Sequence, residues 1–344
     1  MAESADALAS GASPHKGVEV QVLLSAPKWQ TDLFGDQSAF SFIKGGIRLQ
    51  HFLQNPVRHN AEYIGWCLCF YAVWQRFIFQ IEAITPVDWT LGLFDTIAVL
   101  SGASLLQIAS RKRLPLKRYL SKKAMSGRAF LFFLCVFFSA QLLYSLFGNT
   151  LELILELFGF TAMGSGTITL QNKTIWYFLY TAFFAPLGEE FIYRGFVLHR
   201  LERYGKVYAI VLSALLFSVM HGNFLQMIFA FLTGLVLGFV ALEYSILWSI
   251  LLHIINNFLY GEILYRILST APLFVQDYIY RGINIAFFAI GAFWLLHRRK
   301  DLQSYLHQNH TPKKHYCTTL TAIGILLFLL WGIYQGVCNI TQLN

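Results

Sequence analysis

The sequence predicts an all-α protein, a polytopic membrane helix bundle of about eight to nine transmembrane helices. Three observations predict it: an apolar composition, several charge-free segments long enough to cross a bilayer, and a one-sided distribution of Lys and Arg. The chain of 344 residues is 56% hydrophobic and 17% aromatic but only 13% charged, whereas soluble domains carry about 25% charged residues. The composition therefore favours the bilayer as the solvent of this chain.

Five segments contain no Asp, Glu, Lys or Arg, namely residues 129–151, 207–242, 244–261, 282–296 and 316–344. A hydrocarbon core of ~30 Å is crossed by about 20 residues of helix, and 207–242 is long enough for two short crossings. With the less apolar segments included, the expected spans are 62–82, 89–109, 128–148, 174–198, 207–222, 224–242, 244–260, 282–297 and 317–338.

Lys and Arg are concentrated in alternate connections between these spans. With the N-terminus in the cytoplasm, cytoplasmic segments hold 21 of them and the opposite connections hold three, Lys173, Arg266 and Arg281. Short cytoplasmic loops carry an excess of Lys and Arg, so this bias predicts a cytoplasmic N-terminus. It fits a bacterial inner membrane and an endoplasmic reticulum equally.

The expected organisation is an N-terminal cytoplasmic segment over residues 1–61 and a transmembrane bundle over 62–340. The cytoplasmic loops account for the net charge of +8. A nucleic-acid partner is not expected, because no basic stretch interleaved with stacking aromatics occurs in a soluble segment. The membrane itself is the expected partner, together with whatever substrate the polar residues inside the spans bind.

Three polar clusters interrupt the apolar spans. An ionisable group at the bilayer centre costs roughly 2.5 to 3.5 kcal/mol on insertion scales, so such groups usually face a protein interior or a water-filled cavity. The clusters are Glu189, Glu190 and Arg194 in "APLGEEFIYRG", His221 at the end of "ALLFSVMH", and His253 with Asn257 in "LLHIINNF".

The first cluster contains two carboxylates with different expected environments. Glu190 and Arg194 are four residues apart, so they can pair on one helical face. Glu189 points about 100° away, as the 3.6-residue turn requires. The spacing therefore predicts one carboxylate neutralised by an ion pair and one left available.

The other polar residues are expected at a similar depth. His253 and Asn257 are four apart and could project into one cavity, while Asn256 should face elsewhere. At ~1.5 Å per residue from the cytoplasmic ends, Glu189 lies ~14 Å deep, His221 ~21 Å, His253 ~14 Å and Asn257 ~20 Å. These depths place all four groups inside a ~30 Å core.

One available carboxylate, two histidines and an amide suit the hydrolysis of an acyl bond. A buried carboxylate can accept a proton from water. His and Asn side chains can donate hydrogen bonds to the oxyanion of a tetrahedral intermediate. Such a site needs no serine or cysteine nucleophile.

In order and spacing, "EEFIYR", "FSVMH" and "HIINN" resemble the motifs of the CAAX-protease and bacteriocin-processing family of intramembrane proteases. The resemblance covers residues 173–262, which would form the catalytic core. It implies that Glu189 with His221 activates water, and that His253 with Asn257 stabilises the oxyanion. Glu190 and Arg194 would shape the site, and the substrate would be a membrane-delivered peptide, with prenylated CAAX-type C-termini as one candidate class.

Several alternatives remain open at this stage. A mechanism without a cofactor is preferred, but zinc is an alternative, with Glu189, Glu190, His221 and His253 as the ligand set. The sequence lacks the H-E-x-x-H motif of helical metalloproteases. A non-catalytic membrane scaffold and a secondary transporter are the alternative functions. Transporters usually contain two matching halves, whereas the polar cluster here lies in one half.

Overall fold

The computed structural model describes residues 55–84, 90–110, 120, 123–162 and 174–343. Most of the expected N-terminal segment, 1–61, lies outside the described residues. Within the described part, a helix bundle is accompanied by two strands of two residues each, β1 (Phe160–Thr161) and β2 (Thr341–Gln342), which pair antiparallel. The expected all-α membrane helix bundle is confirmed.

The first half of the bundle contains three long helices, and the second half alternates long helices with short irregular ones. In chain order the helices are α2 (Pro56–Ile84), α3 (Leu93–Ser110), α5 (Gly127–Leu157), α6 (Ile175–Leu179), α7 (Ala185–Glu190), α8 (His199–Leu201), α9 (Lys206–Met220), α10 (Phe224–Glu243), α11 (Ile246–Ile255), α12 (Tyr265–Leu268), α13 (Leu273–His297), α14 (Arg299–Gln308), α15 (Lys313–Leu320) and α16 (Ile323–Cys338). Three π-helices, η6 (Tyr180–Phe184), η7 (Phe191–Leu198) and η9 (Asn256–Leu264), and the 3₁₀ turn η8 (Glu202–Tyr204) connect some of them without a break.

Five helical stretches of the described chain are long and apolar enough to cross a membrane, or six if α15 and α16, bent by 70°, count as one span. Two shorter apolar helices, Leu93–Ala109 and Lys206–Met220, coincide with two further expected spans. The expected total of nine therefore stays a prediction. On α13, only Asn284 and Gly291 are buried, and apolar side chains such as Phe293 are exposed, as expected of a helix that faces lipid.

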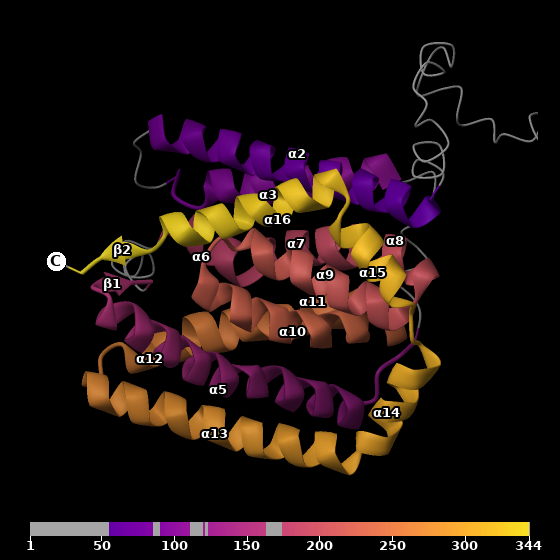
Figure 1. Ribbon diagram of the computed structural model, residues 1–344. Helices are drawn as coiled ribbons and strands as arrows, with labels where there is room; N and C mark the ends of the chain where they lie inside the picture. The colour runs from indigo at the N-terminus through magenta and orange to yellow at the C-terminus, as the bar shows by residue number, and fades with distance from the viewer. Residues whose placement is uncertain (1–54, 85–89, 111–119, 121–122, 163–173, 344) are drawn as a thin grey trace, which may run out of the picture. The chain divides into compact units, whose positions relative to one another are not determined.

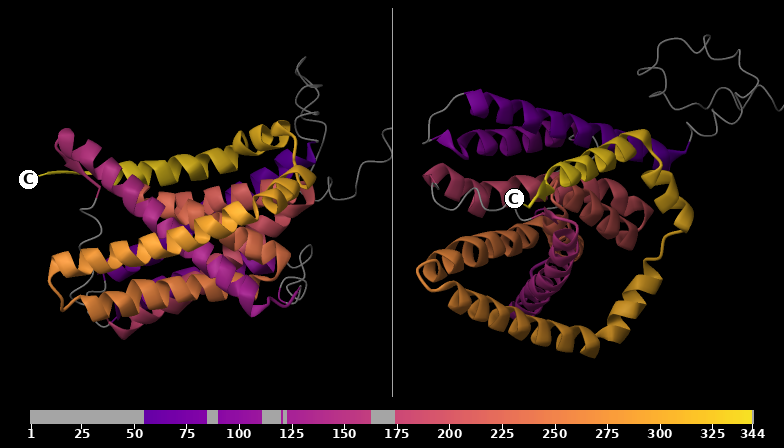
Figure 2. Two further views of the ribbon diagram at one scale, coloured as in Figure 1. Left: turned by 90° about the horizontal axis from the view of Figure 1, so that it is seen from below. Right: turned by 60° about the vertical axis from the view of Figure 1, so that its left-hand side comes forward.

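The helices are arranged around a central group. Figure 1 shows α2, α3 and α16 on one side and α5 and α13 on the other, with α7, α9, α10 and α11 between them. Helices α5 and α13 pack against each other, as the views of Figure 1 and Figure 2 show. A small residue allows α9 and α10 to approach closely: a Cβ on Gly234 of α10 would lie 3.1 Å from the Cβ of Ala214 on α9.

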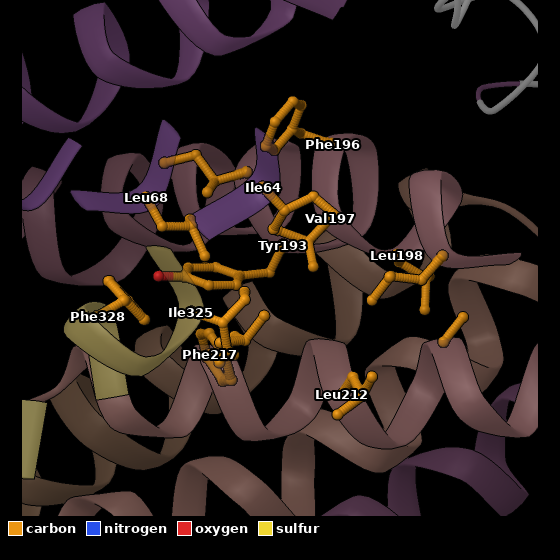
Figure 3. Close-up of a cluster of buried hydrophobic side chains, with 14 of the residues drawn as sticks. Ile64, Leu68, Tyr193, Phe196, Val197, Leu198, Leu212, Phe217, Ile325 and Phe328 are labelled. Carbon is orange, nitrogen blue, oxygen red and sulfur yellow. The ribbon is translucent and has the colours of Figure 1, made fainter. Parts of the chain in front are cut away.

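The largest hydrophobic cluster surrounds η7. Figure 3 shows the Tyr193 ring between side chains of α2, α9 and α16. Each of these helices contributes a buried side chain to the cluster, at most 2% exposed: Ile64 from α2, Phe217 from α9 and Phe328 from α16. The segment that carries the paired glutamates is therefore fixed by apolar contacts from both halves of the chain.

Helix α16 is joined to α2 by a cap and by close backbone approach. Both carboxylate oxygens of Glu62 accept hydrogen bonds from the first amides of α16, Ile323 N and Gly324 N, each at 2.9 Å. Those amides have no partner within their own helix, so an acidic side chain from a neighbouring helix satisfies them. At the same level, Gly65 and Gly324 leave no room for a side chain between the two backbones.

We predict that Gly324→Ala lowers the thermal stability of the protein, because the new Cβ would lie 2.7 Å from Trp66 N. Overpacking of this kind costs about 1–3 kcal/mol. Gly282→Ala on α13 is the matched control, since a Cβ there meets no atom within 4 Å and should stabilise the helix slightly, if at all. Thermal unfolding in detergent measures both, and equal midpoints for the two variants would contradict the close approach of α2 and α16.

Candidate active site

The paired glutamates lie on an unbroken helical path from Ile175 to Tyr204 that contains two π-helical stretches, η6 before them and η7 after them. Short π-helical stretches inside α-helices occur frequently at functional sites. Gly188 and Gly195 flank the glutamates and allow α3 to approach: a Cβ on Gly188 would lie 2.6 Å from Val99, and one on Gly195 would lie 2.7 Å from Gln107. Gln107 also donates a hydrogen bond of 2.7 Å to the carbonyl of Phe191, so α3 fixes the path directly after the glutamates.

Glu190 forms the ion pair expected from the sequence. Its Oε1 lies 3.0 Å from Arg194 Nη1, and both side chains are 0% exposed. The guanidinium also lies over the ring of Phe217, 4.3 Å from its centroid, and donates to the carbonyl of Gly234 at 3.4 Å. Contacts from α9 and α10 therefore add to the environment of the arginine, although its Nε has no hydrogen-bond partner among the described residues.

Two side chains of α11 complete the environment of Glu190. Ser249 Oγ donates a hydrogen bond to Oε2, and His253 Nδ1 lies 3.1 Å from Oε1. A buried carboxylate is tolerated when it is paired and hydrogen-bonded, and Glu190 meets both conditions. Ser249 was not among the residues expected at the site, although its position four residues before His253 places both on one helical face.

Glu189 is the more accessible of the two carboxylates. Its side chain is 13% exposed, and its Oε2 lies 3.8 Å from His253 Nε2. The imidazole of His253 therefore lies between two glutamates, with Nδ1 toward Glu190 and Nε2 toward Glu189. This arrangement separates the carboxylates by role: one is compensated by Arg194, and the other faces a histidine and remains accessible.

His221 lies at the C-terminal cap of α9. Its Nδ1 is 2.9 Å from the carbonyl of Phe217; because a backbone carbonyl only accepts, Nδ1 carries the proton and Nε2 is left for another partner. The rings of His221 and His253 both meet Phe217 edge-on, with centroids 4.9 Å and 5.8 Å away. Among contacts of the described residues, Glu189 pairs with His253, whereas the sequence analysis paired it with His221.

Asn257, one helical turn after His253, lines a polar cavity of about 290 Å³. Its Nδ2 donates to the carbonyl of Thr181 at 2.9 Å. Asn256 lines the same cavity and donates to Asn257 Oδ1 at 2.9 Å, so the expectation that Asn256 faces elsewhere is wrong. The reason is that the chain changes from α11 to the π-helix η9 at Asn256, and i→i+5 bonding alters the side-chain directions of an ideal α-helix.

The candidate zinc ligands do not fit a metal. Among the described residues, no group of three or more His, Cys, Asp or Glu side chains is arranged to hold one. Arg194 and His253 both contact Glu190 Oε1, so this oxygen is already occupied. Zinc ligands instead converge at about 2.0–2.2 Å on one point, so the expected set Glu189, Glu190, His221 and His253 is not supported as a zinc site.

Fold and site together define a multi-pass membrane protein with a carboxylate and imidazole cluster buried among its helices. Residues 171–259 match the family model described as type II CAAX prenyl endopeptidase Rce1-like. This match confirms the resemblance found in the three motifs and supports a CAAX-type intramembrane protease. No match was found among curated proteins or among solved structures.

We predict that Arg194→Met strongly destabilises the protein, because it leaves the Glu190 carboxylate buried without its cation. Removing one partner of a buried ion pair costs about 3–5 kcal/mol. The double variant Glu190→Gln with Arg194→Met should recover part of this loss.

The matched control is Arg281→Met, because Arg281 pairs with Asp277 at 2.8 Å while their side chains are 62% and 54% exposed. An exposed pair contributes little, so its thermal midpoint should stay close to wild type. Equal midpoints for Arg194→Met and Arg281→Met would contradict the burial of the Glu190 pair.

Proposed function

We propose that this protein is an intramembrane endopeptidase that hydrolyses a peptide bond of a membrane-delivered substrate with a glutamate-activated water. One observation carries the proposal: of two adjacent glutamates, Glu190 is paired with Arg194, and Glu189 is accessible and lies 3.8 Å from His253. The match of residues 171–259 to a CAAX endopeptidase family supports the same reaction class.

In the proposed mechanism, Glu189 accepts a proton from water as the water oxygen attacks the carbonyl carbon of the scissile peptide bond. His221 Nε2 accepts a hydrogen bond from the second O–H group of that water, since Nδ1 already donates to Phe217 O. The protonated Glu189 then transfers its proton to the amide nitrogen. The oxyanion re-forms the carbonyl as the C–N bond breaks, so that the products are a carboxylic acid and an amine.

The carbonyl oxygen becomes an oxyanion as the water attacks, and two donors stabilise it. His253 in its protonated form donates from Nε2 while Nδ1 stays on Glu190, and Asn257 donates from Nδ2. Side chains of this kind lower the barrier most when they are held in place before the reaction. Glu190, fixed by its ion pair with Arg194, keeps His253 in position through the contact between Glu190 Oε1 and His253 Nδ1.

The orientation of the site follows from the distribution of Lys and Arg. With the N-terminus in the cytoplasm, as the positive-inside bias favours, Glu189 lies ~14 Å from the cytoplasmic end of its span at ~1.5 Å per residue. A substrate tethered to the cytoplasmic leaflet would reach it. The family description names a CAAX prenyl endopeptidase, so a farnesylated CAAX peptide is the first substrate to test.

We predict that Glu189→Gln and His221→Ala each lower cleavage of an internally quenched farnesylated CAAX peptide by roughly 10²–10⁴-fold, the usual contribution of a general base and its partner. The measurement is initial rate in proteoliposomes that contain the full chain. Glu243→Gln is the matched control, because Glu243 pairs with Lys206 at 2.8 Å and is partly exposed; its rate should equal that of wild type. Wild-type rates for both site variants would overturn the protease assignment.

We also predict that the cleavage rate is unchanged by EDTA and by 1,10-phenanthroline, since no metal-binding group of three or more ligands occurs among the described residues. The assay is the same proteoliposome reaction with and without chelator. If chelation abolished activity and added Zn²⁺ restored it, the metal-free mechanism would be contradicted and the zinc alternative would be supported.

A further inference from the structure

A directed chain of hydrogen bonds connects four residues of three segments, α5, η9 and η6, beside the cavity that Asn257 lines. Gln141 Nε2 of α5 donates to Asn256 Oδ1 at 3.1 Å, Asn256 Nδ2 donates to Asn257 Oδ1 at 2.9 Å, and Asn257 Nδ2 donates to Thr181 O at 2.9 Å. Gln141 and Asn256 are both buried, at 8% exposure each. All four residues line the cavity of about 290 Å³.

The direction of this chain is fixed at its last link. A backbone carbonyl only accepts hydrogen bonds, so the group of Asn257 that faces Thr181 O must be Nδ2. Asn257 Oδ1 then faces Asn256, which must offer its own Nδ2. Asn256 Oδ1 faces Gln141 in turn, and Gln141 must offer Nε2. A flip of any one amide would place two acceptors or two donors against each other.

Thr181 is itself held in place by a second residue of η9 that lines the cavity. Its Oγ1 donates to Glu262 Oε1 at 3.0 Å, and Arg266 Nη2 lies 3.5 Å from Glu262 Oε2. Glu262 is 4% exposed. The acceptor that orients Asn257 therefore belongs to a backbone segment, η6, that a buried carboxylate anchors.

The orientation of Asn257 matters because an amide NH₂ group has two N–H bonds. One is committed to Thr181 O, and the other has no partner among the described residues, on a side chain that borders the cavity. We propose that Gln141 and Asn256 are positioning residues, which lock the amide of Asn257 so that its second N–H is available to the oxyanion. This inference rests on the proposed function. Gln141 lies on α5, outside the three motifs and outside the matched residues 171–259.

Two substitutions of Asn256 separate positioning from a general structural role. Asn256→Leu cannot donate to Asn257 Oδ1 at any pH. Asn256→Asp keeps the shape of the side chain and can donate only when its carboxyl group is protonated. Asn284→Asp is the matched control, because Asn284 is a buried asparagine that accepts from the Tyr260 hydroxyl at 2.7 Å, a bond that a carboxylate can also accept.

The experiment measures kcat and KM for the farnesylated CAAX peptide from pH 4.5 to 8.5 in full-chain proteoliposomes, with each variant expressed as a ratio to wild type at the same pH. We expect kcat of Asn256→Leu to fall roughly tenfold at every pH with little change in KM, less than the ~10²–10³-fold loss on removal of an oxyanion donor. Asn256→Asp should show this deficit at high pH and regain activity as pH falls, because protonation restores the donor. Asn284→Asp should stay near wild type throughout.

The outcomes distinguish the positioning role of Asn256 from the proposed protease function. If wild type cleaves the peptide but Asn256→Asp shows no deficit, or the same deficit at every pH, the positioning role is overturned and the proposed protease function stands. If folded wild type cleaves no farnesylated or unmodified peptide, the proposed function fails and the positioning role fails with it. The pH comparison is made within one variant, so a general loss of stability in Asn256→Leu does not affect it.

Discussion

The wholly buried ion pair between Glu190 and Arg194 is the constraint on which the rest of the site depends. Two opposite charges are tolerated away from water only when they are paired and their remaining hydrogen-bonding atoms are largely satisfied. Here the partners come from three other helices: the Phe217 ring of α9, the Gly234 carbonyl of α10, and Ser249 and His253 of α11. Satisfying one ion pair therefore brings together the helices that carry the three motifs.

The same constraint distinguishes the two glutamates. Glu190 has its charge compensated within its own helix and its oxygens occupied by α11, whereas Glu189 keeps 13% of its side chain exposed. His253 connects the two, since it contacts both carboxylates with different ring nitrogens. A histidine held in this way is oriented before any substrate arrives, which is the condition under which charged groups lower a reaction barrier most effectively.

The sequence predicted where helices occur better than where they begin and end. The span expected at 62–82 is part of a helix that begins at Pro56, and the one expected at 282–297 begins at Leu273. Charged residues mark the limits of an apolar window, but a helix can continue past them when neighbouring groups pair with them, as Arg281 and Asp277 do. The last span, expected as one helix over 317–338, is two helices bent by 70°.

At the site, the sequence by itself determined the features that follow from α-helical periodicity and from the spacing of the motifs. It predicted the pairing of Glu190 with Arg194, the separate direction of Glu189, and the family of the core. Only the tertiary structure decided that His253 is the contact of Glu189, that Ser249 completes the environment of Glu190, and that Asn256 joins Asn257 beside Gln141. The physical reason is the separation in sequence between the contacting residues. An i,i+4 contact is fixed by local helix geometry. The π-helical turn at Asn256 and the partners from distant helices depend instead on how the whole bundle packs.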